Sequence, residues 1–237
     1  MTLTRNCGAA IFALTLLTCG CGAVRQPTYY SLALAPQIQV ASEHSTHPVT
    51  VAVRQFETPA YLRQGRIVYR EHPEQVGFYE YQRWATDPGA TVTAAVVDSL
   101  QSSRVFSYAG AFDGTHRTGY LLTGRLEKLD EIDYGGQVRV EATVSAEMVD
   151  LRTGTLAWSG SATNTANVEG HDVYSVVNQM SRAVDLCLEK LVLSMSEGEA
   201  RTGKRVTGFE EGEGRKVPSL MSSSHEIRPS FELTERR

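Results

Sequence analysis

Apolar and polar residues alternate along three long segments in the middle of the chain. These segments are residues 119–130, 137–151 and 155–165. A period of two is typical of β-strands that bury one face. Tyr134-Gly135-Gly136 and Arg152-Thr153-Gly154 separate the segments, and both are typical turn sequences. The pattern therefore predicts three consecutive strands in an antiparallel meander.

Shorter segments rich in β-branched and aromatic residues surround these strands. We expect strands at residues 29–34, 49–56, 66–70 and 76–82, and another at 105–108. Each segment has the length of an ordinary strand, and polar or turn-forming residues separate it from the next. Strands therefore dominate the first two thirds of the chain.

Two other segments have the period of 3.6 residues that an amphipathic helix shows. The first begins at Thr86-Asp87-Pro88, where a capping side chain precedes a proline, and should end near Ser103. The second runs from His171 to Met195 and has an apolar face that should cover the sheet. Two helices packed on a mainly antiparallel sheet form a two-layer α+β sandwich, which is the predicted fold. The apolar face consists of Val173, Val177, Met180, Val184, Cys187, Leu188 and Leu191.

The N-terminal residues predict export and lipidation. Residues 7–18 form an apolar run of about a dozen residues, which suits a signal peptide but is too short to span a bilayer. Small residues precede Cys21, as in the bacterial lipobox, which this segment resembles and whose cysteine carries diacylglycerol. We expect the lipid at Cys21, with Cys19 as the alternative. An ordinary secretory signal cleaved nearby is the other interpretation.

These elements divide the chain into four parts. We expect a lipoprotein signal peptide at residues 1–20, an anchor and short linker at 21–27, one domain at 28–196 and a disordered polar tail at 197–237. A lipidated protein of this kind lies on the periplasmic face of the cell envelope. Gly22 follows the anchor cysteine where an Asp would resemble an inner-membrane retention signal, which favours the outer membrane.

Composition and charge exclude several classes of partner. The net charge of −4 and the pI of about 5.9 give no reason to expect nucleic acid, which requires clustered Lys and Arg. The sequence also contains no polybasic run for attachment to a membrane surface. Three of the four cysteines lie within the first 21 residues, so no disulfide framework is expected.

Candidate catalytic and metal-binding residues are sparse. The six histidines are scattered, and no zinc-protease, nucleophile-elbow or phosphate-loop motif is present. His44 and His47 are close in sequence but have no neighbouring cysteine or acidic ligand. Asp130, Glu131 and Asp133 lack the spacing of a calcium loop and indicate a charged strand end. We therefore expect no enzyme, no cofactor and no metal site, and Cys187 is expected to be a buried, inert thiol.

Aromatic residues allow two interpretations. They could line a groove or a partner surface, or they could pack the edge of the sheet beneath the first helix. Alternation along a strand places some of the tyrosines on the outer face, so both interpretations stay open. The residues concerned are Trp84, Trp158, Tyr61, Tyr69, Tyr79 and Tyr81.

Several segments, taken in order over roughly residues 28–195, resemble the ABC-type transport auxiliary lipoproteins, the PqiC-like family. The most distinctive is Tyr79-Glu80-Tyr81-Gln82-Arg83-Trp84-Ala85, a Y-x-Y-x-R-W-A pattern. The tail lies outside the resemblance. The other segments are Tyr30-Ser31-Leu32, Pro59-Ala60-Tyr61-Leu62-Arg63, Arg66-Ile67-Val68-Tyr69-Arg70, Leu122-Thr123-Gly124-Arg125-Leu126 with Asp130-Glu131, and Asp150-Leu151-Arg152-Thr153-Gly154 ahead of Trp158.

The resemblance implies a non-catalytic accessory of an envelope transport system. Such a system pairs an ABC permease and ATPase with an MCE-domain protein that moves phospholipid or other hydrophobic molecules between membranes. The accessory would dock or tether the assembly, and it could form a homo-oligomer. A structural lipoprotein without a transporter and an envelope hydrolase are the alternatives. The expected partner contact comprises Arg63, Arg70, Tyr79, Tyr81, Arg83 and Trp84.

Overall fold

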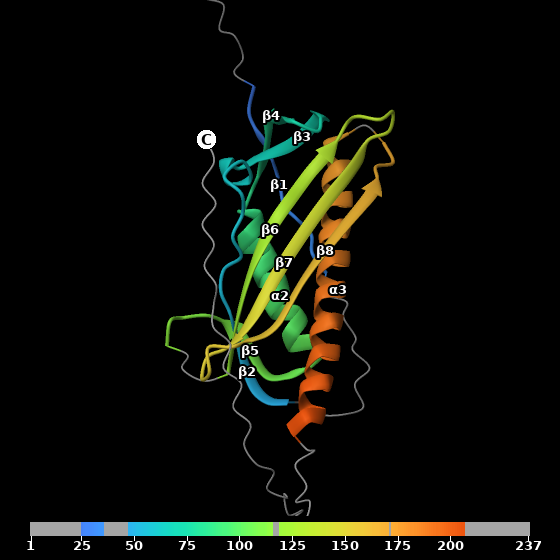
Figure 1. Ribbon diagram of the computed structural model, residues 1–237. Coiled ribbons are helices and arrows are strands. Elements are labelled where there is room, and N and C mark those ends of the chain that lie inside the picture. Colours follow the sequence, from blue (N-terminus) through green and yellow to red (C-terminus); the bar gives the residue numbers. More distant parts are fainter. Residues whose placement is uncertain (1–24, 36–46, 116–118, 171, 207–237) are drawn as a thin grey trace, which may run out of the picture.

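The computed structural model describes residues 25–35, 47–115, 119–170 and 172–206. Within them the chain forms eight strands, one short 3-10 helix (η1) and two α-helices (Figure 1). Their bounds in chain order are β1 Thr28–Tyr30, β2 His47–Val53, η1 Leu62–Gln64, β3 Arg66–His72, β4 Gln75–Trp84, α2 Pro88–Ser103, β5 Phe106–Ala111, β6 Tyr120–Ile132, β7 Arg139–Asp150, β8 Leu156–Asn167 and α3 Val173–Val206.

The molecule has two layers. The strands form one mixed sheet, and both helices lie behind it in the view of Figure 1. α3 packs on β7 and β8, and α2 packs on β5 and the neighbouring strands. The predicted two-layer α+β fold is confirmed, and neither of the two described helices packs on the opposite face of the β6–β7–β8 meander.

β6 organises the sheet. One of its edges pairs with β7 in a long antiparallel ladder, and β7 pairs with β8 in another, so the predicted meander is confirmed. The other edge of β6 pairs in parallel with β2 at one end and with β3 at the other. β3 forms an antiparallel hairpin with β4, and this hairpin lies at the upper end of Figure 1. Antiparallel ladders contain most of the paired residues, although the parallel joins extend the sheet.

The core lies between the sheet and the helices. Leu122, Leu126 and Leu129 of β6 are fully buried, as are Met180 and Val184 of α3. Burial of one such side chain contributes about 1.5–3 kcal/mol relative to leaving it in water. The apolar stripe predicted for α3 is therefore the face that packs on the meander.

Local capping sets the bounds of α2. The Asp87 side chain accepts a hydrogen bond of 2.9 Å from the backbone N–H of Ala90, and Pro88 occupies the first turn. At the other end Arg104 adopts a left-handed conformation with φ of 53° and terminates the helix. Both bounds agree with the sequence prediction.

α3 is longer than the sequence pattern predicts. It ends at Val206 rather than near Met195, so the first ten residues of the predicted tail are helical. Glu197, Glu199, Ala200, Arg201 and Lys204 are good helix formers, and an established helix extends at little cost through such residues. Among the described residues, no helix is both long and apolar enough to cross a bilayer. The predicted signal peptide, Cys19, Cys21 and residues 207–237 lie outside the described residues.

Candidate functional site

The six predicted contact residues lie on η1, β3 and β4, and they divide into two groups. Trp84 is buried in the core with 5% of its surface exposed, and it fixes the corner between β4 and α2. Arg70 and Tyr79 turn towards carboxylates of β6. The other three residues, Arg63, Tyr81 and Arg83, lie at the surface. Among the described residues, no carboxylate forms an ion pair with Arg63 or Arg83. The inner group makes contacts within the domain, and the outer group lies at the surface.

Arg70 forms an ion pair with Asp130 on the face of β6 that the helices leave open. Its Nε lies 2.6 Å from Oδ2 of Asp130, whose side chain is only 1% exposed. The Tyr61 ring packs against the guanidinium, with 5.8 Å between the Arg70 Cζ and the ring centroid. Burial and the nearby Asp130 charge raise the pKa of Tyr61 to about 12. The cluster joins the β3–β4 hairpin to β6 through paired charges.

Glu131 is the next residue along β6 and therefore faces the helices. Its Oε2 accepts a hydrogen bond of 2.8 Å from the Tyr79 hydroxyl, and the Tyr69 ring packs edge-on against Tyr79. Burial raises the pKa of Glu131, and burial together with the Glu131 charge raises the pKa of Tyr79. A cavity of about 790 Å³ adjoins this pair and extends to Val176 of α3.

The burial of Asp130 and Glu131 corrects the sequence interpretation of a charged strand end. Only Asp133, beyond the end of β6, is exposed. The partners come from β3 and β4, which lie 60 and 52 residues away in sequence, so local sequence could not reveal them. Among the described residues, no group of three histidine, cysteine, aspartate or glutamate side chains is arranged to hold a metal ion.

Cys187 lies in the core, as expected. Its thiol is fully buried, and Sγ lies 3.5 Å from the carbonyl oxygen of Ala142. Burial raises the pKa of Cys187 to about 11, which keeps the thiol protonated at neutral pH. This residue has the environment of a packing residue and not of a nucleophile.

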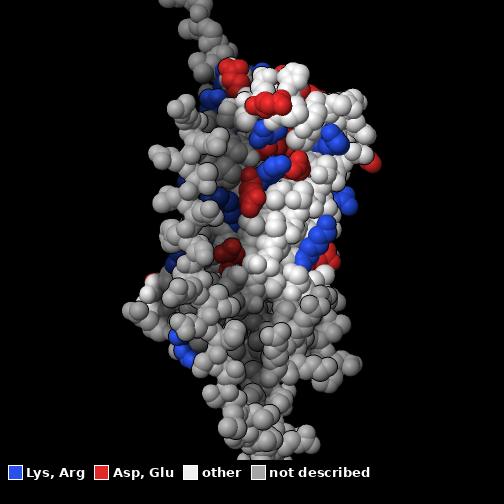
Figure 2. Space-filling model, in the orientation of Figure 1, with Lys and Arg blue, Asp and Glu red and all other residues white. Residues whose placement is uncertain are grey.

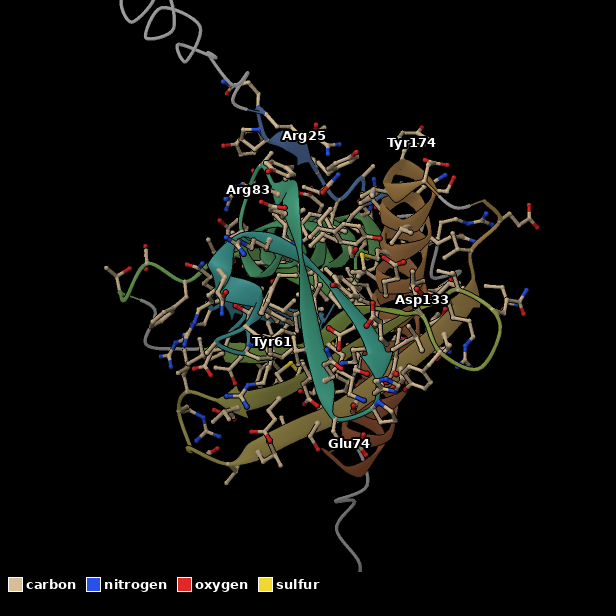
Figure 3. All side chains as sticks on the ribbon, turned by 90° about the horizontal axis from the view of Figure 1, so that it is seen from above. Arg25, Tyr61, Glu74, Arg83, Asp133 and Tyr174 are labelled. Atoms are coloured by element: carbon tan, nitrogen blue, oxygen red, sulfur yellow. The ribbon has the colours of Figure 1, made fainter. Side chains whose placement is uncertain are left out.

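Arg83 of the outer group belongs to a row of residues across three strands. Arg83 of β4 lies directly opposite Arg66 of β3 on one side and Tyr29 of β1 on the other. Directly opposed residues share a face of the sheet, and Trp84 next to Arg83 points into the core. Arg25 adds a further guanidinium, because its Cζ lies 4.9 Å from the centroid of the Tyr81 ring. Figure 3 shows Arg25 and Arg83 on the β1 side of the hairpin.

The open face of the meander is a surface on which neither described helix packs. Figure 2 shows charged side chains of both signs around an uncharged middle. A hollow of about 720 Å³ lies where segment 54–57 borders the meander, lined by charged residues such as Arg54 and Glu147 and by small residues such as Ser145. At its margin Glu57 and Arg125 form an exposed ion pair with an N–O distance of 2.9 Å. The hollow therefore offers charged and hydrogen-bonding groups to a ligand.

β8 forms the free edge of the meander. It pairs only with β7 among the described strands, and its 12 residues contain neither a charge nor a proline. Natural sheets normally protect an edge with charges, prolines, bulges or a short strand, because unpaired backbone groups recruit other strands. Local sequence does not reveal this edge, because pairing between distant segments decides which strands lie at the edges of the sheet.

Comparison with known proteins agrees with this architecture. The family model described as the ABC-type transport auxiliary lipoprotein component matches residues 30–192. Protein XCC0632 from Xanthomonas campestris has a similar structure, with a TM-score of 0.66 and 14% identity over 75% of this chain and 99% of that one. An uncharacterized protein gives a TM-score of 0.51 and 14% identity, over 77% of this chain and 100% of that one. No curated protein matches the chain.

Proposed function

Because this chain belongs to the family of ABC-type transport auxiliary lipoprotein components, we propose that it is the non-catalytic docking subunit of an MCE-type envelope transport system. The observation that carries the proposal is the family match over residues 30–192, which covers nearly all of the folded domain. The proposed cargo is phospholipid or another hydrophobic molecule. The permease, the ATPase and the MCE-domain protein of the same system would be its partners.

A lipid anchor gives this subunit its position. The family consists of lipoproteins, so the chain belongs to the cell envelope. We place the acyl chains on Cys21, because small residues precede it in a lipobox-like segment. Two or more acyl chains, at about 0.8 kcal/mol per buried CH₂, retain a protein on a membrane. The outer membrane is the proposed location, since Gly22 follows the anchor.

We assign the contact with the MCE-domain protein to the edge of β8 and the adjoining open face. An unprotected edge offers backbone donors and acceptors to an added strand, which is a common mode of protein recognition. β8 presents such an edge over 12 residues, and exposed side chains such as Ser161 and Thr165 lie along it. Repeated backbone hydrogen bonds would supply the affinity. The side chains of the open face would supply selectivity.

Charge placed on this edge tests the assignment. Ser161→Lys with Thr165→Lys should abolish co-purification of the MCE-domain protein, because lysines on an edge strand oppose strand addition. Asn178→Lys with Ser102→Lys adds the same charge at exposed helical positions and is the matched control. The tagged chain is isolated from membranes after gentle crosslinking. Equal recovery of the MCE-domain protein with both double variants would refute the assignment to β8.

The same samples distinguish a partner from a second copy. If β8 pairs with β8 of another chain, the edge variant will reduce the mass of the purified lipoprotein itself, as measured by light scattering. If β8 pairs with the MCE-domain protein, the mass of the isolated lipoprotein will be unchanged. Recovery of no permease, ATPase or MCE-domain protein with the wild-type chain would contradict the transport role as a whole.

A further inference from the structure

Four arginines from separate segments gather around the β1 end of the sheet. Arg66 and Arg83 are direct cross-strand neighbours, and Arg25 lies over the ring of Tyr81. Arg63 belongs to η1, which ends at the capping residue Gly65. The carbonyl oxygen of Gly65 accepts a hydrogen bond of 2.9 Å from the backbone N–H of Trp84, so η1 lies beside the end of β4. We call Arg25, Arg63, Arg66 and Arg83 the arginine patch.

Positive charge is in excess at the arginine patch among the residues that the structure describes. The ion pairs between described residues involve Arg70, Arg125 and Lys128, and none involves the patch. The acidic residue nearest in sequence to the arginine patch is Glu80, which lies beside Tyr81. The patch has four guanidinium groups, so this single carboxylate does not balance its charge. Like charges directly opposite each other across two strands destabilise a sheet. Among the described residues no carboxylate is ion-paired with the patch, and such a juxtaposition indicates an external anion.

The position of the proposed anchor identifies the source of that anion. Arg25 follows Cys21 by four residues, and four extended residues span at most about 14 Å. Thr28 follows Cys21 by seven residues, so β1 must lie within about 25 Å of the acylated thiol. Arg83 and Arg66 are the next residues across the sheet from β1. An anchored chain therefore holds this end of the sheet close to the membrane surface.

We infer that the arginine patch binds anionic phospholipid headgroups and thereby orients the domain on its membrane. This inference rests on the proposed anchor at Cys21 for the location of the patch. Guanidinium groups form paired hydrogen bonds with phosphate oxygens, and Tyr29, which is 59% exposed beside Arg83, has the amphipathic ring typical of a membrane interface. With the β1 end facing the lipid, the edge of β8 remains accessible to a partner.

Lipid crosslinking tests the inference. A photoreactive benzophenone amino acid replaces Gln64, which is exposed between Arg63 and Arg66. The purified mature chain is mixed with vesicles of phosphatidylcholine alone or with about one third phosphatidylglycerol, floated on a density gradient and irradiated. Flotation with phosphatidylcholine alone reports the acyl anchor. The increase in lipid crosslinking caused by phosphatidylglycerol reports the patch, so the two proposals are measured separately.

Arginine substitutions supply the decisive comparison. Arg66→Gln with Arg83→Gln should lower the phosphatidylglycerol-dependent crosslinking about 25-fold, because each arginine near an anionic surface contributes about fivefold. Arg152→Gln with Arg182→Gln removes the same charge from exposed positions outside the patch and should leave crosslinking unchanged. Crosslinking that does not depend on phosphatidylglycerol, or that falls equally in both double variants, would overturn the inference. Circular dichroism verifies that each variant is folded.

Discussion

Replacing Arg70 with methionine should lower the free energy of unfolding by about 3 kcal/mol. Methionine keeps much of the apolar stem of the arginine side chain. It leaves the carboxylate of Asp130, whose side chain is only 1% exposed, without its charged partner. Breaking a buried pair from one side costs about 3–5 kcal/mol. The Arg70 side chain is 18% exposed, so water can reach part of the site, and we expect the lower end of that range. In a domain of this size, the melting temperature should fall by about 6–12 °C.

A double-mutant cycle isolates the interaction from the change in packing. Urea denaturation is measured for wild type, Arg70→Met, Asp130→Leu and the double variant. The double variant should regain most of the lost stability, because an apolar pair at a buried site is often as stable as the ion pair it replaces. Arg125→Met is the matched control, since its ion pair with Glu57 has side-chain exposures of 56% and 72% and should contribute less than about 1 kcal/mol.

Two results would refute this reasoning. If Arg70→Met costs no more than Arg125→Met, the pair does not join the hairpin to β6. If Asp130→Leu and Arg70→Met have additive effects, the two side chains are not coupled.

Three further predictions concern single side chains. Burial raises the pKa of Glu131 above its ordinary value of 4.5. The folded state therefore favours the protonated carboxyl group, and the free energy of unfolding falls as this group ionises with rising pH. Glu131→Gln should therefore be more stable than wild type at neutral pH in urea denaturation, with the difference disappearing below pH 4.5; a difference that widens in acid would contradict the argument. Asp87→Ala should cost about 1 kcal/mol through loss of the α2 cap, whereas Asp98→Ala on the exposed side of the same helix should cost less than half of that; thermal melts that do not separate the two variants would show that the cap is not stabilising. The Cys187 thiol should react with a thiol reagent at pH 8 only after denaturation, because it is buried and its pKa is about 11; rapid reaction of the folded chain would place it at the surface.

Elements defined by local sequence could be predicted well. α2 is predicted because Asp87 and Pro88 form a start motif and the apolar stripe follows within two turns. The meander is predicted because its turns connect neighbouring strands, so that sequence order and spatial order agree. Such features require only interactions between residues close in the chain.

Features created by distant pairing could not be predicted. β2 and β3 join the same edge of β6 in parallel, and no turn sequence specifies that choice. Asp130 is buried because the β3–β4 hairpin brings Arg70 beside it. The arginine patch does not appear as a run of basic residues in the sequence, because Arg66 and Arg83 become neighbours only when β3 pairs with β4. The candidate sites of this chain therefore depend on sheet topology.

Fatty-acid labelling tests the lipid tether most directly. Cells that express wild type, Cys21→Ala or Cys19→Ala receive a labelled fatty acid, and the chain is then recovered from membrane and soluble fractions. We expect label and membrane retention for wild type and Cys19→Ala, and no label for Cys21→Ala. An unlabelled, soluble wild-type chain would contradict the tether, and loss of label in Cys19→Ala alone would move the anchor to the other cysteine.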